Sequence, residues 1–138
     1  MILLLLWTLL FAFLTLQDGS DTVSTGLGFA NWLKSVFALP QDAETLHLLL
    51  RKAAHLICMA GESLLLYLTL RAGRIPVGKS ACISLACCLV LAVLSEAVKI
   101  PIPGRHFSWR DSGLNALGAV AGAAAGLVCS ARRRRMKN

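Results

Sequence analysis

Four residues that can carry charge or exchange a proton repeat at helical spacing inside one long apolar stretch. Arg51, His55, Cys58 and Glu62 follow one another at steps of four, three and four residues. Side chains at these steps lie on one face of an α-helix. A guanidinium group on such a stripe can bind an anion, and an imidazole can act as a general base. The stripe therefore predicts a polar face on an otherwise lipid-compatible helix.

Two later stretches carry groups of the same kind. Glu96 and Lys99 lie one helical turn apart, and Asp111 and Asn115 lie one turn apart on another predicted helix. At 1.5 Å per residue, His55, Glu96 and Asn115 all fall roughly 25 Å from the basic loop or tail that flanks their own segment. The polar groups of three helices are therefore expected to meet at one level. We take the following residues as the candidate ligand-binding set: Arg51, Lys52, His55, Glu96, Lys99, Arg105, Arg110, Asp111 and Asn115.

A plainer interpretation of the basic residues stays open. Lysine and arginine near the end of a membrane-spanning helix often reach the interface and act only as anchors. Glu96 and Asp111 are shorter and cannot reach as far, so we expect them to pair with Lys99, Arg105 or Arg110.

Glu62 is the one acid predicted near mid-bilayer. No basic residue on its own stripe lies close enough to neutralise it. We expect this intramembrane acid to be protonated or hydrogen-bonded across the bundle, with Ser95 or Asn115 as the partner. A thin watery crevice that opens to the polar level is the alternative.

Composition decides what kind of molecule must hold these groups. The chain has 138 residues, 57% of them hydrophobic, and a formal charge of +7. Such a chain is too apolar for an ordinary soluble domain and too short for several domains, so we expect a single domain over residues 1–138. The positive charge gathers in short loops and the tail, where membrane topology explains it better than nucleic-acid binding does. The five cysteines lie in apolar segments without metal-ligand spacing, so no metal site is predicted. No cofactor is predicted either, because the sequence has no cofactor-binding motif.

Four stretches approach the roughly 20 residues that a bilayer core requires. They span residues 1–16, 46–70, 80–100 and 109–130. The basic loop Arg71–Lys79 and the basic tail 131–138 place both chain ends in the cytoplasm of a multi-pass cell-membrane protein. The first apolar run lacks the basic start and the cleavage site of a signal peptide, so it is expected to remain as a span. The fold predicted is an all-α bundle of four transmembrane helices.

The segment between the first two spans has its own pattern. Phe29, Trp32, Leu33, Val36 and Phe37 repeat at helical spacing, with polar residues between them. The pattern predicts an extracytoplasmic amphipathic helix on the outer leaflet. A loop segment packed over the bundle is the alternative. Before the second span, a break and an N-cap are predicted at Pro40 and Asp42.

These motifs resemble those of the VanZ-like family, small membrane proteins named for an accessory protein of teicoplanin resistance. The run Arg51–His55 is similar to the family's RKxAH motif, and Gln17–Ser20 is weakly similar to its polar stretch after the first span. The segment Glu96–Asn115 is similar to the family's DExxQ, PGR, S, D and N series, followed by a glycine-rich helix.

The chain also departs from the family pattern at two places. Cys58 and Met59 stand where the family has an acid and an aromatic residue, and the nearest acid is Glu62. Lys99 stands where the family has Gln, and Ser95 precedes Glu96 in place of Asp. An activity that needs both missing acids is not expected here. A binding role survives, because the lysine adds charge suited to an anionic head group.

Three functions are compatible with these residues. The preferred one is binding of an anionic membrane lipid or a lipid-linked envelope precursor at the outer leaflet; the resemblance implies an effect on glycopeptide susceptibility. The second is a membrane-embedded enzyme acting on a lipid-linked phosphate or acyl group, with His55 or Glu96 as general base. No residue is assigned as catalytic on this basis. The third is a small assembly protein that oligomerises through the glycine-rich fourth helix, where Gly118 and Gly122 matter more than any charge.

Overall fold

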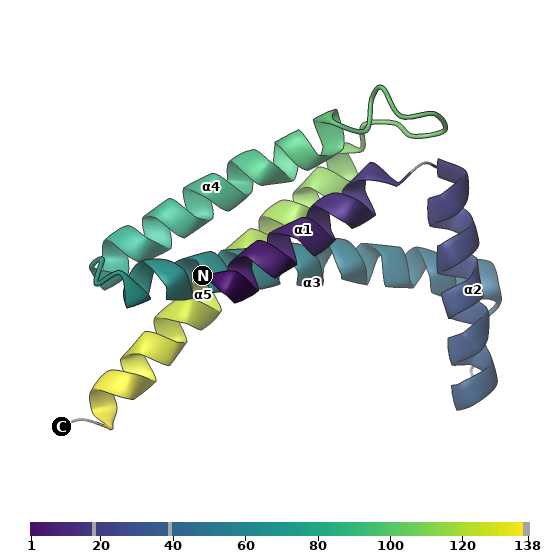
Figure 1. Cartoon of the computed structure of the whole chain (residues 1–138). Helices are drawn as coiled ribbons and strands as arrows, with labels where there is room; N and C mark the ends of the chain where they lie inside the picture. The colour runs from purple at the N-terminus through teal and green to yellow at the C-terminus, as the bar shows by residue number, and fades with distance from the viewer. Residues whose placement is uncertain (18, 39, 137–138) are drawn as a thin grey trace.

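The computed structural model describes residues 1–17, 19–38 and 40–136, except for the side chain of Arg134. Asp18 of the family-like polar stretch and Lys137 of the basic tail lie outside the described residues. The described chain is all-helical, as predicted (Figure 1). It runs through α1 (Ile2–Leu16), α2 (Gly19–Phe37), α3 (Ala43–Ala72), α4 (Val77–Ala97) and α5 (Trp109–Arg135).

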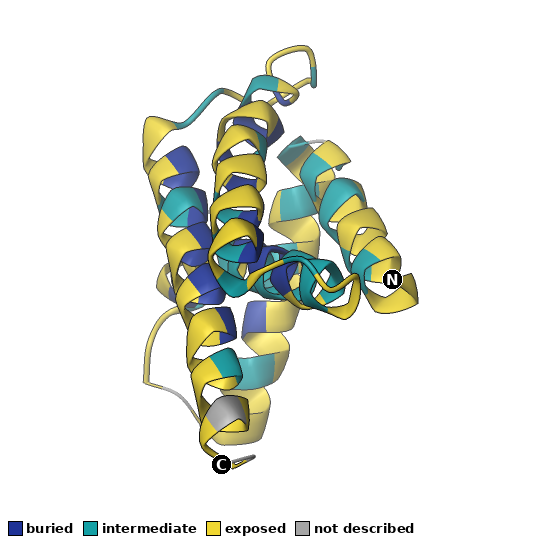
Figure 2. Ribbon diagram, turned by 90° about the vertical axis from the view of Figure 1, so that its left-hand side faces the viewer, coloured by how far each residue is buried: buried dark blue, intermediate teal, exposed yellow. Residues whose placement is uncertain are grey.

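Helices α3, α4 and α5 pack against one another and form the bundle. The core between them consists of Met59, Cys88, Ala92 and Ala119, all of them buried. Figure 2 shows that the buried positions follow the inner faces of these helices, while the outer faces are exposed. Many exposed positions are large and apolar, including Val90 on α4. A bundle with a small core and an apolar exterior suits a lipid environment.

The glycines of α5 allow this helix to lie unusually close to α3. A Cβ atom built on Gly118 would overlap the carbonyl oxygen of Leu56, and one built on Gly122 would overlap the carbonyl oxygen of Ala60. The glycine face predicted from the sequence therefore packs inside the chain. Oligomerisation through this helix remains a prediction.

Three helices, α3, α4 and α5, are long and apolar enough to cross a membrane. Helix α1 has 15 residues. A fourth span is reached only if α1 and α2, which lie at a sharp angle to each other, are taken as one broken span (Figure 1). The predicted spans 46–70, 80–100 and 109–130 coincide with the three long helices, whose bounds differ by several residues at some ends. The observed fold is thus an all-α bundle of membrane-span helices.

The end of α4 corrects one detail of the prediction. Lys99 was expected inside the third span, but α4 ends at Ala97 and Lys99 lies in the following turn. The backbone N–H groups of Lys99 and Ile100 donate to oxygens three residues earlier, which is how a helix tightens as it ends. Pro101 explains the position, because it lacks an N–H and disfavours helical conformation in the residue before it.

The segment between α1 and α3 is helical, so the loop alternative is wrong for residues 19–37. Helix α2 packs against α3 and buries Ala30, while Phe29 and Trp32 stack at 5.7 Å between ring centroids. Its place at the outer leaflet remains a prediction. Asp42 caps α3 as predicted, since its side chain accepts a 2.7 Å hydrogen bond from the backbone N–H of Thr45.

Candidate functional site

Two polar contacts join α3 to α5 on adjacent helical turns. Arg51 donates from Nη2 to Oδ2 of Asp111 over 2.7 Å. One turn further along both helices, Nδ1 of His55 lies 3.1 Å from Oδ1 of Asn115. The two helices run in the same direction, so residues four apart on α3 meet residues four apart on α5. The expectation that these groups share a level is confirmed for these pairs.

Helix α4 supplies the third side of the same cluster. The amide Nδ2 of Asn115 donates to the hydroxyl of Ser95 over 3.1 Å, and Lys99 pairs with Glu96 through Oε1. Glu96, Lys99 and Asn115 are all at most 1% exposed. A buried pair of opposite charges is the arrangement that makes such burial tolerable.

The predicted acid pairs are confirmed in one case and corrected in the other. Glu96 pairs with Lys99, as expected. Asp111 pairs with Arg51, and not with Arg105 or Arg110. The reason is that Arg51 lies opposite Asp111 on the parallel helix α3. Arg105 instead forms hydrogen bonds near the start of α2.

Arg105 ties the α4–α5 loop to the start of α2. Its Nη1 donates to the carbonyl oxygen of Gln17 over 3.0 Å and to the hydroxyl of Thr22 over 2.7 Å. The backbone N–H of Gly19 also donates to the carbonyl oxygen of Pro103. Burial, followed by the positive charge of Arg51, lowers the pKa of the Arg105 guanidinium from its usual range. Arginine stays protonated at neutral pH despite such a shift, so Arg105 remains a cation.

A cavity of about 510 Å³ lies between α1, α2, α3 and this loop. Most of its lining is apolar. No Asp or Glu is among the described residues that line it. Its basic lining residues are His47, Arg51, His55, Lys99 and Arg105. The acids Glu96 and Asp111 contact these basic groups from outside the lining.

Two predicted residues do not join the cluster. Lys52 and Arg110 are exposed, and within the described chain neither forms a hydrogen bond or an ion pair with the other candidates. They fit the interpretation as anchors at the membrane interface. His47, in contrast, lines the cavity and was missed. A signal was available, because His47 lies one turn before Arg51 on the same stripe.

Glu62 has a different partner from either of those expected. Ser95 and Asn115 bond to each other, and the hydroxyl of Thr8 on α1 lies 2.8 Å from Oε1 of Glu62. The other carboxyl oxygen, Oε2, is buried and has no hydrogen-bond partner within the described chain. On the same face, Trp7 donates from its indole N–H to the carbonyl oxygen of Cys58 over 2.9 Å. Two polar contacts therefore hold α1 against α3.

Replacing Glu62 by glutamine is expected to leave thermal stability within about 1 kcal/mol of wild type, or to raise it. The amide oxygen can still accept from Thr8, and a neutral side chain removes the cost of burying an ionisable group. Thermal unfolding in detergent micelles measures the effect. A loss well above that range would show that a charged carboxylate is required at this position.

Comparison with known proteins adds one finding to this geometry. A search of curated proteins and a search of solved structures gave no match. The family model described as VanZ/LLP1 matches residues 1–130, nearly the whole chain, including every residue of the cluster and of the cavity lining. The resemblance found in the Arg51–His55 and Glu96–Asn115 motifs is thereby confirmed, and the chain belongs to the VanZ/LLP1 family.

Proposed function

We propose that this VanZ-family protein binds an anionic amphiphile, a membrane lipid or a lipid-linked envelope precursor, at the outer leaflet. One observation carries the proposal: a mainly apolar cavity that is lined by basic residues and by no described Asp or Glu. Such a cavity suits a molecule with an apolar chain and an anionic head group. Its volume lies within the range of about 300–1,000 Å³ that is typical of small-molecule sites.

The head group is bound by Arg51, Lys99 and Arg105. Charge-assisted hydrogen bonds from guanidinium and ammonium groups to phosphate are among the strongest that side chains make. The side chain of Arg51 is 40% exposed, so it can reach a ligand while Asp111 orients it. Glu96, which does not line the cavity, orients Lys99 through their ion pair.

The apolar chain lies against α1 and the adjoining faces of α2 and α3. Phe11 and Leu14 of α1, Phe29 of α2 and Ile57 of α3 line this part of the cavity. Burial of apolar surface there adds about 25 cal/mol for each Å² removed from contact with water. A water-soluble anion lacks this contribution, and a neutral lipid lacks the ion pairs.

The outer-leaflet location follows from the distribution of basic residues. The Arg71–Lys79 loop and the arginine-rich end of α5 lie at the bundle end away from the cluster, and basic loops favour the cytoplasm. The end of α5 is then cytoplasmic and the cavity opens at the outer side. The N-terminus is cytoplasmic as well when α1 and α2 form the fourth, broken span. Sequestering an envelope lipid there would alter susceptibility to teicoplanin-type glycopeptides, which is the effect that the family resemblance implies.

Substituting Arg105 by alanine is expected to remove co-purifying anionic lipid, because one of the three head-group cations is lost. Native mass spectrometry of protein released gently from its own membrane measures the bound lipid. The wild-type protein should retain a defined anionic lipid, and occupancy should fall about ten-fold or more in the variant, as expected when a charge-assisted bond of roughly 1.5–3 kcal/mol is lost.

Lys52→Ala is the matched control. It removes one positive charge from the same end of α3, but Lys52 is exposed and does not line the cavity. Retention by wild type and the control, with loss from the Arg105 variant, supports a specific site. Equal lipid on all three proteins would show that the cavity cations are structural, and would favour the assembly function.

A further inference from the structure

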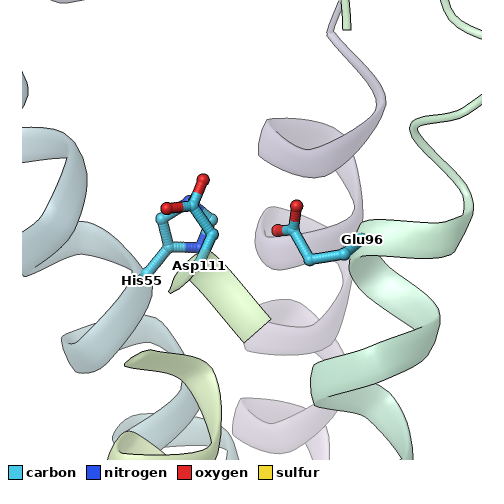
Figure 3. Close-up of side chains that lie close together, drawn as sticks. All are labelled: His55, Glu96 and Asp111. Carbon is cyan, nitrogen blue, oxygen red and sulfur yellow. The ribbon is translucent and has the colours of Figure 1, made fainter. Parts of the chain in front are cut away.

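Three groups that can bind a metal ion meet where α3, α4 and α5 converge. One ligand atom each from His55, Glu96 and Asp111 lies within 4.8 Å of the others, and Figure 3 shows the three side chains extending toward a common region. The sequence analysis predicted no metal site, and these three residues are 41 and 15 positions apart along the chain. We propose that they form a binding site for a divalent transition-metal ion of the Mn²⁺ or Zn²⁺ class.

The hydrogen bonds around His55 show which ring nitrogen is free. The hydroxyl of Ser95 donates to the carbonyl oxygen of Ala92, so its oxygen accepts from the amide Nδ2 of Asn115. The amide oxygen of Asn115 then faces Nδ1 of His55 and can only accept, which places the proton of a neutral imidazole on Nδ1. An outer hydrogen bond of this type is the usual support for a metal-ligating histidine.

The free nitrogen faces an acceptor rather than a donor. Nε2 of His55 lies 3.5 Å from Oδ2 of Asp111. In the neutral ring this nitrogen carries a lone pair, and the carboxylate oxygen that it faces accepts a hydrogen bond from Arg51 and cannot donate one to the ring. The lone pair of Nε2 and the second carboxylate oxygen of Asp111, Oδ1, are therefore the groups that a metal ion can bind.

Glu96 supplies the observation that favours a metal ion over a shared proton. Its side chain is fully buried, and Oε2 has no hydrogen-bond partner within the described chain, since Lys99 contacts Oε1. A proton shared between His55 and Asp111 would leave this oxygen unsatisfied, at a cost of about 1–3 kcal/mol or more. A metal ion ligated by all three residues satisfies it.

The ligand set narrows the class of ion. One imidazole with two carboxylates suits Mn²⁺, Zn²⁺ or Fe²⁺, whereas Mg²⁺ and Ca²⁺ prefer oxygen ligands alone. Bonds of about 2.0–2.2 Å require the ligand atoms to draw closer than they are, by rotation of the carboxylates. Arg51 and Lys99 use one oxygen of each carboxylate and leave the other for the metal. Because His55 lines the cavity, an ion can reach the site from there.

The test uses MnCl₂ with the full-length protein in detergent micelles. Mn²⁺ is chosen because thiolates bind it less readily than Zn²⁺, and the chain has five cysteines. Equilibrium dialysis should give about one Mn²⁺ per chain. Pulsed electron paramagnetic resonance of the wild-type protein should show coupling of the bound ion to an imidazole nitrogen. The absence of that nitrogen coupling would overturn the proposal without depending on any variant.

Variants locate the site. His55→Ala and Asp111→Asn should each raise the Kd for Mn²⁺ at least about ten-fold, as losing one of three ligands implies. His106→Ala is the matched control, because His106 is exposed in the α4–α5 loop, and it should bind as wild type does. Equal binding by all four proteins would place the ion elsewhere and refute the site. The lipid proposal stands or falls separately, since no lipid is added here.

Discussion

Replacing Glu96 by leucine is expected to destabilise the protein by about 3–5 kcal/mol, the largest effect of any single side chain in the cluster. Glu96 is fully buried, and its partner Lys99 is 1% exposed. Without the carboxylate, the ammonium group stays buried with no opposite charge in contact. Removing one partner of a buried ion pair is costly for this reason, whereas exposed pairs contribute little. Thermal or chemical unfolding in detergent micelles measures the loss.

The double variant Glu96→Leu with Lys99→Met is the control that isolates the charge. It removes both ions and keeps apolar groups of similar size, so most of the stability should return, and in some buried pairs such replacement even stabilises. A double variant as unstable as the single one would mean that shape at Glu96, rather than the unpaired charge, accounts for the loss. Full stability of the single variant would show that Lys99 reaches water when its partner is removed.

Much of this cluster could be predicted because the spacing of residues along a helix determines their positions in space. Arg51 and His55 are four residues apart, and so are Asp111 and Asn115. Because parallel helices rise equally per residue, Arg51 lies level with Asp111 and His55 lies level with Asn115. The contacts that result are 2.7 Å and 3.1 Å long. The level of a side chain along the bundle can thus be predicted from the sequence once the spans are known.

The sequence did not predict which face of each helix packs against its neighbour, or where the short segments lie. Thr8 contacts Glu62 because α1 packs on α3, and nothing in an apolar run of leucines shows which face does so. The same holds for Arg105, whose partners lie more than 80 residues away, near the start of α2. Long-range packing of irregular segments depends on all the surfaces at once, so the cavity itself could not be predicted.

The metal-ligand arrangement shows the same limit. Histidine and carboxylates at local spacing would have been recognised, but His55, Glu96 and Asp111 come from three helices. Their convergence depends on how closely α5 approaches α3. That distance is set by the glycine face of α5, where no side chain separates the two backbones.

Leucine in place of Gly122 is therefore expected to cost about 3 kcal/mol or more and to disrupt the site as well. Even a Cβ atom at this position would overlap the carbonyl oxygen of Ala60, and backbone cannot move aside as a flexible side chain can. The helices must separate, which lengthens the Arg51–Asp111 and His55–Asn115 contacts that cross the same interface. Unfolding in detergent micelles gives the stability, and native mass spectrometry gives the lipid retained.

Gly113→Leu is the matched control, since it makes the same substitution on the same helix. A Cβ atom at Gly113 meets nothing within 4 Å, so this variant should fold and should gain up to about 1 kcal/mol from better helix propensity. The difference between the two variants measures the close packing of α5 on α3. If the Gly122 variant were as stable as the control and kept its lipid, α5 would not approach α3 closely, and the geometry proposed for both the lipid and the metal would fail with it.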